Sequence, residues 1–164
     1  MHITFAPKGI LQINDARITY KNFAGEGDVY NREGDRNFAL IIDDQEIADA
    51  LMAEGWNVKS KPPREEGELP FMYIPVKVKF NDWGPNCYLV TGNVQTKLDE
   101  STVHRLDKVR IASVDLDIRP YDWKRQEGTP YEKSGRTAYL TGIRVFQQEV
   151  DRFAADYGNE TEPF

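Results

Sequence analysis

The chain has 164 residues and a formal net charge of −6, a length that most simply makes one domain. One cysteine and two histidines exclude a disulfide framework and leave too few soft ligands for a structural zinc site. No run approaches the roughly 18 apolar residues of a membrane-spanning helix, and the N-terminus lacks a secretion pattern. We therefore expect a soluble cytoplasmic protein.

The first third of the chain predicts two strands, a loop and a helix. Residues 10–20 interleave apolar and polar side chains, which indicates a strand, and the glycine-rich residues 22–36 indicate a long loop. An apolar run at 37–42 predicts the second strand. Acids at 43–44 then begin a helix that ends at Gly55, and its expected apolar stripe is Ile47, Ala48, Leu51 and Met52.

The remaining elements are mostly strands. Residues 56–59 predict a short strand before a break at 62–67. Residues 71–80 alternate, with Met72, Ile74, Val76, Val78 and Phe80 on one face and Tyr73, Pro75, Lys77 and Lys79 on the other. We expect a turn at 81–86, a strand at 87–91, a short helix at 99–106 with Val103 and Leu106 inward, a strand at 109–119, a loop at 120–135 and a strand at 137–147.

This order of elements predicts a mainly β protein. Six or seven strands come in clusters rather than in alternation with helices, which disfavours a doubly wound sheet. A small antiparallel barrel with one or two inserted short helices fits, and the OB-fold is the most economical barrel of this size. We expect this domain to cover residues 1–148 and an acidic tail to cover residues 149–164.

Aromatic and basic residues gather in the predicted loops and on one strand face. Unpaired bases need flat rings to stack on, and phosphates need cations, so this mixture is typical of a surface that binds single-stranded nucleic acid. Residues 103–144 hold nine Lys and Arg against six acids in an acidic protein. The candidate DNA-binding residues are Tyr20, Phe23, Tyr30, Arg32, Arg36, Phe38, Lys77, Lys79, Arg119, Tyr121, Trp123 and Lys124.

Each candidate also has a purely structural interpretation. Phe23 and Phe38 adjoin strands and suit a core. Tyr121 and Trp123 could pack against an edge. Arg32 and Arg36 could pair with neighbouring acids in the loop, and the two lysines could only keep a sheet face soluble.

The tail concentrates negative charge. Residues 149–164 hold five acids and one base, so −4 of the net charge lies there and −2 on the other 148 residues. The last residues include Glu160, Glu162, Pro163 and Phe164. A terminal Phe with its carboxylate fits an apolar pocket that has a basic rim, which predicts a segment that binds partner proteins; the alternative is a frayed terminus.

Several segments resemble small phage-encoded single-stranded DNA-binding proteins. They are residues 31–38, 55–59, 61–67 and 114–123, and the resemblance spans roughly residues 10 to 150. It implies an OB-fold, sequence-tolerant binding of single strands, and a role in phage replication or recombination inside the bacterial host. The partners it implies are single-stranded DNA and, through the tail, replication or recombination proteins. A homodimer stays open, and the tetramer of the bacterial housekeeping form should not be assumed.

Two other functions compete with this hypothesis. Asp115 and Asp117 share a strand face and could hold Mg²⁺ for phosphodiester cleavage with Lys124 as a helper, although no third acid is placed by the sequence. The acidic helix at 43–54 could instead mimic nucleic acid and inhibit a host protein. The hypothesis that we carry forward is a non-catalytic binding protein with no cofactor, whose tail folds over the basic groove when DNA is absent.

Overall fold

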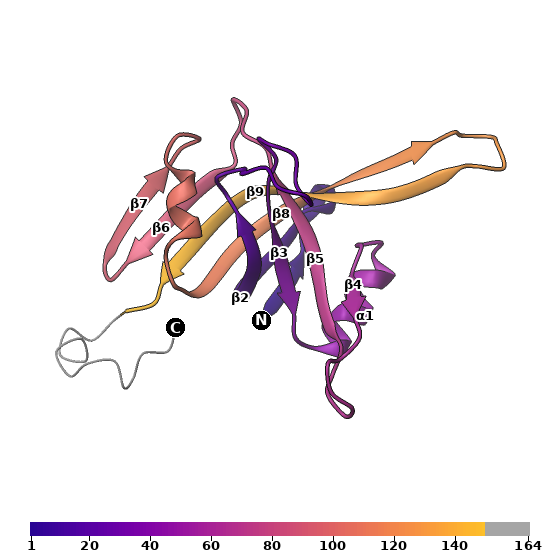
Figure 1. The fold of residues 1–164 in the computed structure, drawn as a ribbon, viewed down its shortest axis with the longest axis horizontal. Helices are drawn as coiled ribbons and strands as arrows, with labels where there is room; N and C mark the ends of the chain where they lie inside the picture. Colours follow the sequence, from indigo (N-terminus) through magenta and orange to yellow (C-terminus); the bar gives the residue numbers. More distant parts are fainter. Residues whose placement is uncertain (150–164) are drawn as a thin grey trace.

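In the computed structural model, which describes residues 1–149, strands dominate (Figure 1). The proposed tail residues Glu160, Glu162, Pro163 and Phe164 lie outside the described residues. The elements are β1 (His2–Phe5), η1 (Pro7–Gly9), β2 (Leu11–Asn22), β3 (Arg36–Ile42), α1 (Gln45–Ala53), β4 (Lys59–Lys61), β5 (Phe71–Val78), β6 (Asn86–Thr91), β7 (Val94–Leu98), η2 (Val103–Asp107), β8 (Ile111–Arg125) and β9 (Lys133–Gln147).

Five of these strands roll around one core. They lie in the order β5, β3, β2, β8, β9, and a parallel pairing of Val76 with Ala138 and Lys77 with Tyr139 brings β9 back against β5. This pairing covers only two positions, so the sheet is rolled but not closed along its length. The strand order and the partial opening are those of an OB-like barrel, which confirms the predicted fold class. Parallel pairings of β9 with β5 and β6 are the departures from an antiparallel barrel.

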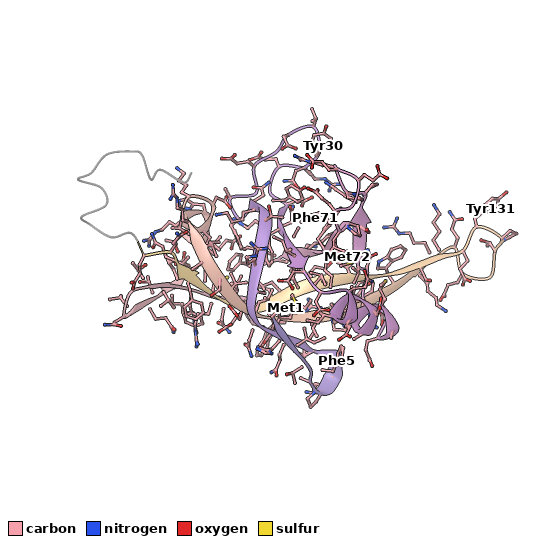
Figure 2. All side chains as sticks on the ribbon, turned by 90° about the horizontal axis from the view of Figure 1, so that it is seen from below. Met1, Phe5, Tyr30, Phe71, Met72 and Tyr131 are labelled. Atoms are coloured by element: carbon pink, nitrogen blue, oxygen red, sulfur yellow. The ribbon has the colours of Figure 1, made fainter. Side chains whose placement is uncertain are left out.

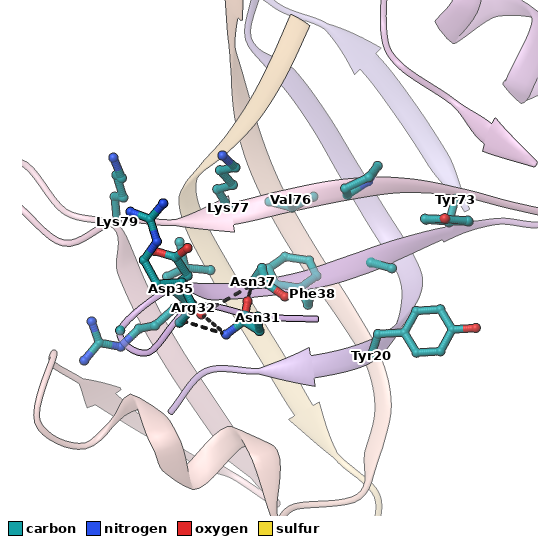
Figure 3. Close-up of a pocket in the computed structure, with 15 residues that line it drawn as sticks. Tyr20, Asn31, Arg32, Asp35, Asn37, Phe38, Tyr73, Val76, Lys77 and Lys79 are labelled. Carbon is teal, nitrogen blue, oxygen red and sulfur yellow. Dashed lines mark hydrogen bonds between the residues drawn. The ribbon is translucent and has the colours of Figure 1, made fainter. Parts of the chain in front are cut away.

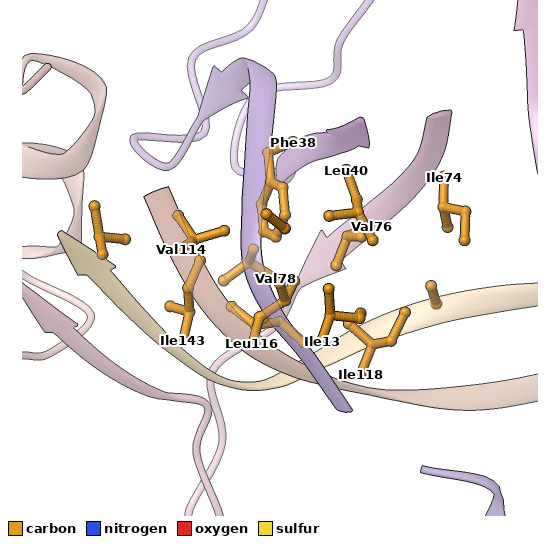
Figure 4. Packing of buried hydrophobic residues seen from close by; sticks show 14 of the residues in the cluster. Ile13, Phe38, Leu40, Ile74, Val76, Val78, Val114, Leu116, Ile118 and Ile143 are labelled. Carbon is orange, nitrogen blue, oxygen red and sulfur yellow. The ribbon is translucent and has the colours of Figure 1, made fainter. Parts of the chain in front are cut away.

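Alternation along the strands builds the core. Ile13, Leu40, Val76 and Leu116 point inward from four different strands, and each is at most 2% exposed (Figure 4). Phe23 and Phe38 stack inside the same core with ring centroids 5.3 Å apart. Removing this apolar surface from water is the main favourable contribution to folding.

The predicted helix at 43–55 is confirmed. It begins at Asp44, whose carboxylate accepts a hydrogen bond from the Glu46 N–H at 2.8 Å, and it gives way to Gly55 at φ +95°. Ala48 and Leu51 are buried against the sheet, but Met52 is 45% exposed, so the predicted apolar stripe is one residue too wide.

Four other elements differ from those expected from the sequence. β1 and β7 were not expected, because neither has a buried alternating face; only Leu98 is buried in the two. The predicted helix at 99–106 is the short 3₁₀ helix η2, although Val103 and Leu106 do point inward. The short strand expected at 56–59 is β4 at 59–61, with Trp56 buried before it.

The largest correction concerns the predicted loop at 120–135. β8 continues to Arg125 and β9 begins at Lys133, so only residues 126–132 form a loop. Beyond Ile118, β8 has lost β2 as a neighbour, and the two long strands leave the barrel as a hairpin (Figure 1). Pro120 is tolerated there because β8 has a free edge. We call residues 120–137 the arm.

Candidate nucleic-acid interface

A groove of about 520 Å³ lies on the outer face of β3 and β5 (Figure 3). Its floor is formed by the outward residues of these strands, and its rim by the loop between β2 and β3. Among the residues that line it are Tyr20, Arg32, Tyr73, Lys77 and Lys79. Figure 3 shows Lys77 and Lys79 pointing to the same side of β5, with the rings of Tyr20 and Tyr73 at the other end of the groove.

The alternation predicted for residues 71–80 produces this floor. Met72, Ile74, Val76 and Val78 are buried, whereas Tyr73, Pro75 and Lys77 face outward. Residues that are directly paired across strands share a face. The registers therefore set a row of outward side chains across the barrel: Asn37 beside Lys77, Lys77 beside Tyr139, and Tyr139 beside Arg119.

Three rings form an aromatic cluster at one end of the groove, which we define as Tyr20, Phe71 and Tyr73. Phe71 and Tyr73 stack at 5.4 Å, and Tyr20 meets both edge-on at 6.1 and 6.4 Å. The Lys61 ammonium lies 4.8 Å from the centroid of the Tyr20 ring and 3.2 Å from its hydroxyl. These contacts hold the rings in place while Tyr20 stays 57% exposed.

A β-bulge turns Tyr20 outward. The register between β2 and β3 shifts between Thr19 and Asn22, and Tyr20 has φ +51°. A bulge leaves one residue out of the ladder and redirects its side chain. Tyr20 therefore reaches the groove instead of continuing the alternation of β2.

The loop between β2 and β3 is braced at both of its ends. The Asp107 carboxylate accepts hydrogen bonds from the N–H groups of Phe23 and Ala24 at 2.8 and 2.9 Å, and Arg36 Nε donates to the Phe23 carbonyl at 3.0 Å. Lys21 donates to the carbonyls of Leu106 and Val109 at the end of η2. Burial lowers the pKa of Lys21, and the charge of Asp107 opposes that shift.

A second space of about 1,140 Å³ continues the groove past this loop. It shares Tyr20 and Tyr73 with the groove and adds Tyr30, His104 and Lys108 to the wall. Tyr30 is 95% exposed at the tip of the loop, where Figure 2 shows it standing away from the barrel.

The arm carries rings and cations on one face. Arg119 at its base lies 4.7 Å above the Tyr139 ring, and Tyr121 meets the same ring edge-on at 6.2 Å. Trp123 follows on that face with Arg125 5.0 Å from its centroid. Its ring packs against Gly135, where an added Cβ would lie 2.6 Å from the indole, so only glycine leaves room for it.

The other face of the arm is fixed to the body by Arg136. Its guanidinium donates to both carboxylate oxygens of Asp122 and, at 2.7 Å, to the Glu54 carbonyl at the end of α1. It also lies 5.1 Å from the Trp56 ring. The hydrogen bond lowers the pKa of Asp122 and raises that of Arg136. Lys124 is exposed on this side.

The floor of the groove carries no negative charge. The outward residues of β3 are Asn37, Ala39 and Ile41, and those of β5 are Phe71, Tyr73, Pro75 and Lys77. No acid is among them. Within residues 1–149, one acidic residue lines the groove, and it is Asp35 at the rim.

Residues 3–161 match the family model described as "Putative phage ssDNA-binding domain". The chain belongs to this family. This agrees with the resemblance found in segments 31–38, 55–59, 61–67 and 114–123. No curated protein sequence matches the chain.

Solved structures share the fold. A C-terminal truncation of the single-stranded DNA-binding protein from bacteriophage Enc34 aligns with a TM-score of 0.56 and 13% identity, over 89% of this chain and 90% of that one. The same phage protein in complex with ssDNA aligns with a TM-score of 0.58 and 11% identity, over 92% and 93% of the two chains. At identities this low, the alignments show that the two proteins share a fold.

Most of the candidate DNA-binding residues fall along one surface. Tyr20, Arg32, Lys77 and Lys79 line the groove, and Tyr30 lines the space beside it. Arg119, Tyr121 and Trp123 continue outward along the arm through the Tyr139 row. Lys124 faces the opposite side of the arm, beside Arg136.

Three candidates have side chains that are already engaged inside the protein. Phe23 and Phe38 are 0% and 2% exposed, and each covers the other, so no base can reach either ring without opening the core. Arg36 has a side chain only 21% exposed, and it bonds the Phe23 carbonyl and, at 3.4 Å, Glu100. It therefore braces the loop, with a partner other than the acids expected from the sequence.

Sequence reasoning missed Lys61, Phe71 and Tyr139. Lys61 and Phe71 face each other in the pairing of β4 with β5, and Tyr139 meets Lys77 only through the parallel pairing of β9 with β5. The alternation of residues 71–80 puts Phe71 on the same face as Tyr73, so the sequence could have identified it as a candidate. Nothing in the sequence places Tyr139 beside Lys77.

The geometry does not favour the nuclease alternative. The Asp115 carboxylate accepts a hydrogen bond from the Asp15 N–H at 2.9 Å, and burial raises the pKa of Asp117. No group of three or more His, Cys, Asp or Glu that could hold a metal lies within residues 1–149. Lys124 lies seven residues beyond Asp117 along β8, roughly 23 Å away at the usual rise of a strand.

The described part of the chain contains no helix of the length and apolar character needed to span a bilayer.

Proposed function

We propose that this protein binds single-stranded DNA without sequence preference, in the groove over β3 and β5. The observation that carries the proposal is the groove itself, where the rings of Tyr20 and Tyr73 lie with Lys77 and Lys79 and where the outward residues of β3 and β5 include no acid. Stacking contributes about 1–3 kcal/mol per base, and each cation on a phosphate adds a salt-dependent contribution. The Enc34 protein, which shares this fold, has been solved in complex with ssDNA, and this supports the same ligand here.

Bases stack on the aromatic cluster in this proposal. Tyr20 offers the most exposed ring, and Lys61 covers that ring in the free protein. An arriving base takes the place of the ammonium, which then turns to a neighbouring phosphate. Lys77, Lys79 and Arg32 hold further phosphates along the groove.

The absence of sequence preference follows from how the polar side chains are used. Asn31 and Asn37 are the amides on the groove wall that could read base edges. Asn37 Nδ2 donates to Asn31 Oδ1 at 2.9 Å, while Asn31 Nδ2 bonds the carbonyls of Glu26, Arg32 and Asp35. Both amides are thus used to hold the loop together and are not free to read base edges. Contact with the bases then falls mainly to the aromatic rings, which accept any base because every base has a flat face.

The biological role that we propose is to protect and organise single strands during phage replication or recombination in the bacterial cytoplasm. The acidic segment 149–164 recruits partner proteins and competes with DNA for the groove, because both are anions. Deletion of residues 156–164 is expected to leave DNA affinity unchanged or raised and to abolish partner recruitment. A large loss of DNA affinity would contradict this scheme.

A salt titration tests the proposal. The anisotropy of a labelled dT oligonucleotide of about 30 residues, measured over a series of NaCl concentrations, should give a log–log slope of about −0.7 for each phosphate contacted. A mixed-sequence oligonucleotide should bind equally well. No binding at low salt, or cleavage of the oligonucleotide in Mg²⁺ that is lost in Asp117→Ala, would overturn it.

A further inference from the structure

A small hollow opens where β5 and β9 separate. The two strands pair only at residues 76–77 and 138–139, and on one side of this pairing lies a space of about 170 Å³. It is lined by Trp56, Asn57, Lys59, Ile74, Pro75, Lys77, Arg136, Thr137 and Ala138. Three cations therefore converge from β4, β5 and β9, and none of these lining residues is acidic.

The three cations differ in freedom. Arg136 is fixed by Asp122, the Glu54 carbonyl and the Trp56 ring, so it forms a rigid wall. Lys59 and Lys77 form no ion pair within residues 1–149, and both are exposed. Lys59 pairs with Tyr73 across β4 and β5, which puts it on the same outer face as the groove. Two free ammonium groups beside a fixed guanidinium are a favourable site for an anion.

The hollow adjoins the groove on one side and the arm on the other. Lys77 and Pro75 line both the groove and the hollow. Arg136 lines both the hollow and an open recess of about 620 Å³ that contains Trp123 and Lys124. A strand lying in the groove can therefore continue past Lys77 to the base of the arm.

We propose that the hollow binds one backbone phosphate of the DNA strand and guides that strand from the groove toward Trp123 and Lys124. This inference rests on the proposed function. The hollow has about a third of the volume of the groove, so it suits a phosphate rather than a stacked nucleotide. It also gives Lys124, which faces away from Tyr121, a place on the path of the strand.

The test uses Lys59→Gln with Lys97→Gln as the matched control. Both lysines are exposed strand residues, Lys59 on β4 and Lys97 on β7, and Figure 1 shows β7 on the opposite side of the molecule from β4. Binding is measured for dT oligonucleotides from about 4 to 20 residues. The full chain with Lys59→Gln should match the wild type on the shortest ones and bind the longer ones about five-fold more weakly, with a salt slope lower by about 0.7. Lys97→Gln should match the wild type throughout.

Neutral methylphosphonate linkages locate the phosphate. Substitution of one linkage at a time should weaken wild-type binding at a position where Lys59→Gln shows no further loss. An effect of Lys59→Gln that requires a 5′-terminal phosphate would overturn guidance of the strand in favour of capture of an end. Unchanged affinity and slope of Lys59→Gln at all lengths would refute the hollow alone, whereas failure of the wild type to bind any oligonucleotide would refute the proposed function.

Discussion

Replacement of Tyr20 by alanine should weaken DNA binding about 5- to 150-fold. The ring is 57% exposed and is stacked on neither Phe71 nor Tyr73, so a base can reach it once Lys61 moves aside. Loss of one stacked base costs about 1–3 kcal/mol, and about 1.4 kcal/mol corresponds to a ten-fold change in affinity. The salt slope should change little, because the substitution removes no cation.

The fold should survive this substitution. Two edge-to-face contacts are lost, each worth about 0.5–1.5 kcal/mol, and the positive φ at position 20 is no worse for alanine than for tyrosine. Thermal unfolding followed by circular dichroism should show a lower midpoint and an intact transition.

Two variants control the measurement. Tyr20→Phe keeps the ring and loses only the hydrogen bond to Lys61, so its affinity should stay within about two-fold of the wild type. Phe5→Ala removes an aromatic side chain of similar exposure, 46%, which Figure 2 shows on the side of the barrel opposite Phe71. It should bind as the wild type does. If Tyr20→Ala binds within two-fold of the wild type, the assignment of the aromatic cluster is wrong.

Four further predictions follow from particular side chains. Arg32→Gln and Lys77→Gln should each reduce the log–log salt slope by about 0.7, and an unchanged slope would remove that residue from the interface. Phe23→Ala should lower the free energy of unfolding by about 3–5 kcal/mol in a urea titration, because it empties a buried site; a loss below 1 kcal/mol would contradict the packing. Asp122 has its pKa lowered by Arg136, so its contribution to stability is complete above the ordinary value of 3.8 and is lost as the pH falls below it. The difference in melting temperature between Asp122→Asn and the wild type should therefore shrink in acid. A constant difference would argue against a stabilising ion pair between Asp122 and Arg136. Burial raises the pKa of the Cys87 thiol to about 12, so iodoacetamide at pH 8 should label it only after denaturation.

The local elements could be predicted wherever one side of the chain is buried. The alternation of residues 71–80 and the acidic start and glycine stop of α1 each depend on residues close together in sequence, so the sequence determined them by itself. The same alternation predicted correctly that Tyr73, Lys77 and Lys79 share a face. The sequence predicts a loop in place of the arm because, beyond Ile118, the arm has no buried side to impose a pattern.

The assembly of the interface was decided by the tertiary structure. Whether Phe23 lies in the core or in the groove depends on its partner Phe38, which is fifteen residues away. A core Phe and a groove Phe look alike in the sequence. The bulge that turns Tyr20 outward and the two-residue pairing that sets Tyr139 beside Lys77 arise from the register between strands. Register is fixed by packing of the whole barrel rather than by any one segment. The sequence by itself therefore determined which side chains are available to bind DNA, and only the rolled sheet decided which of them lie on one continuous surface.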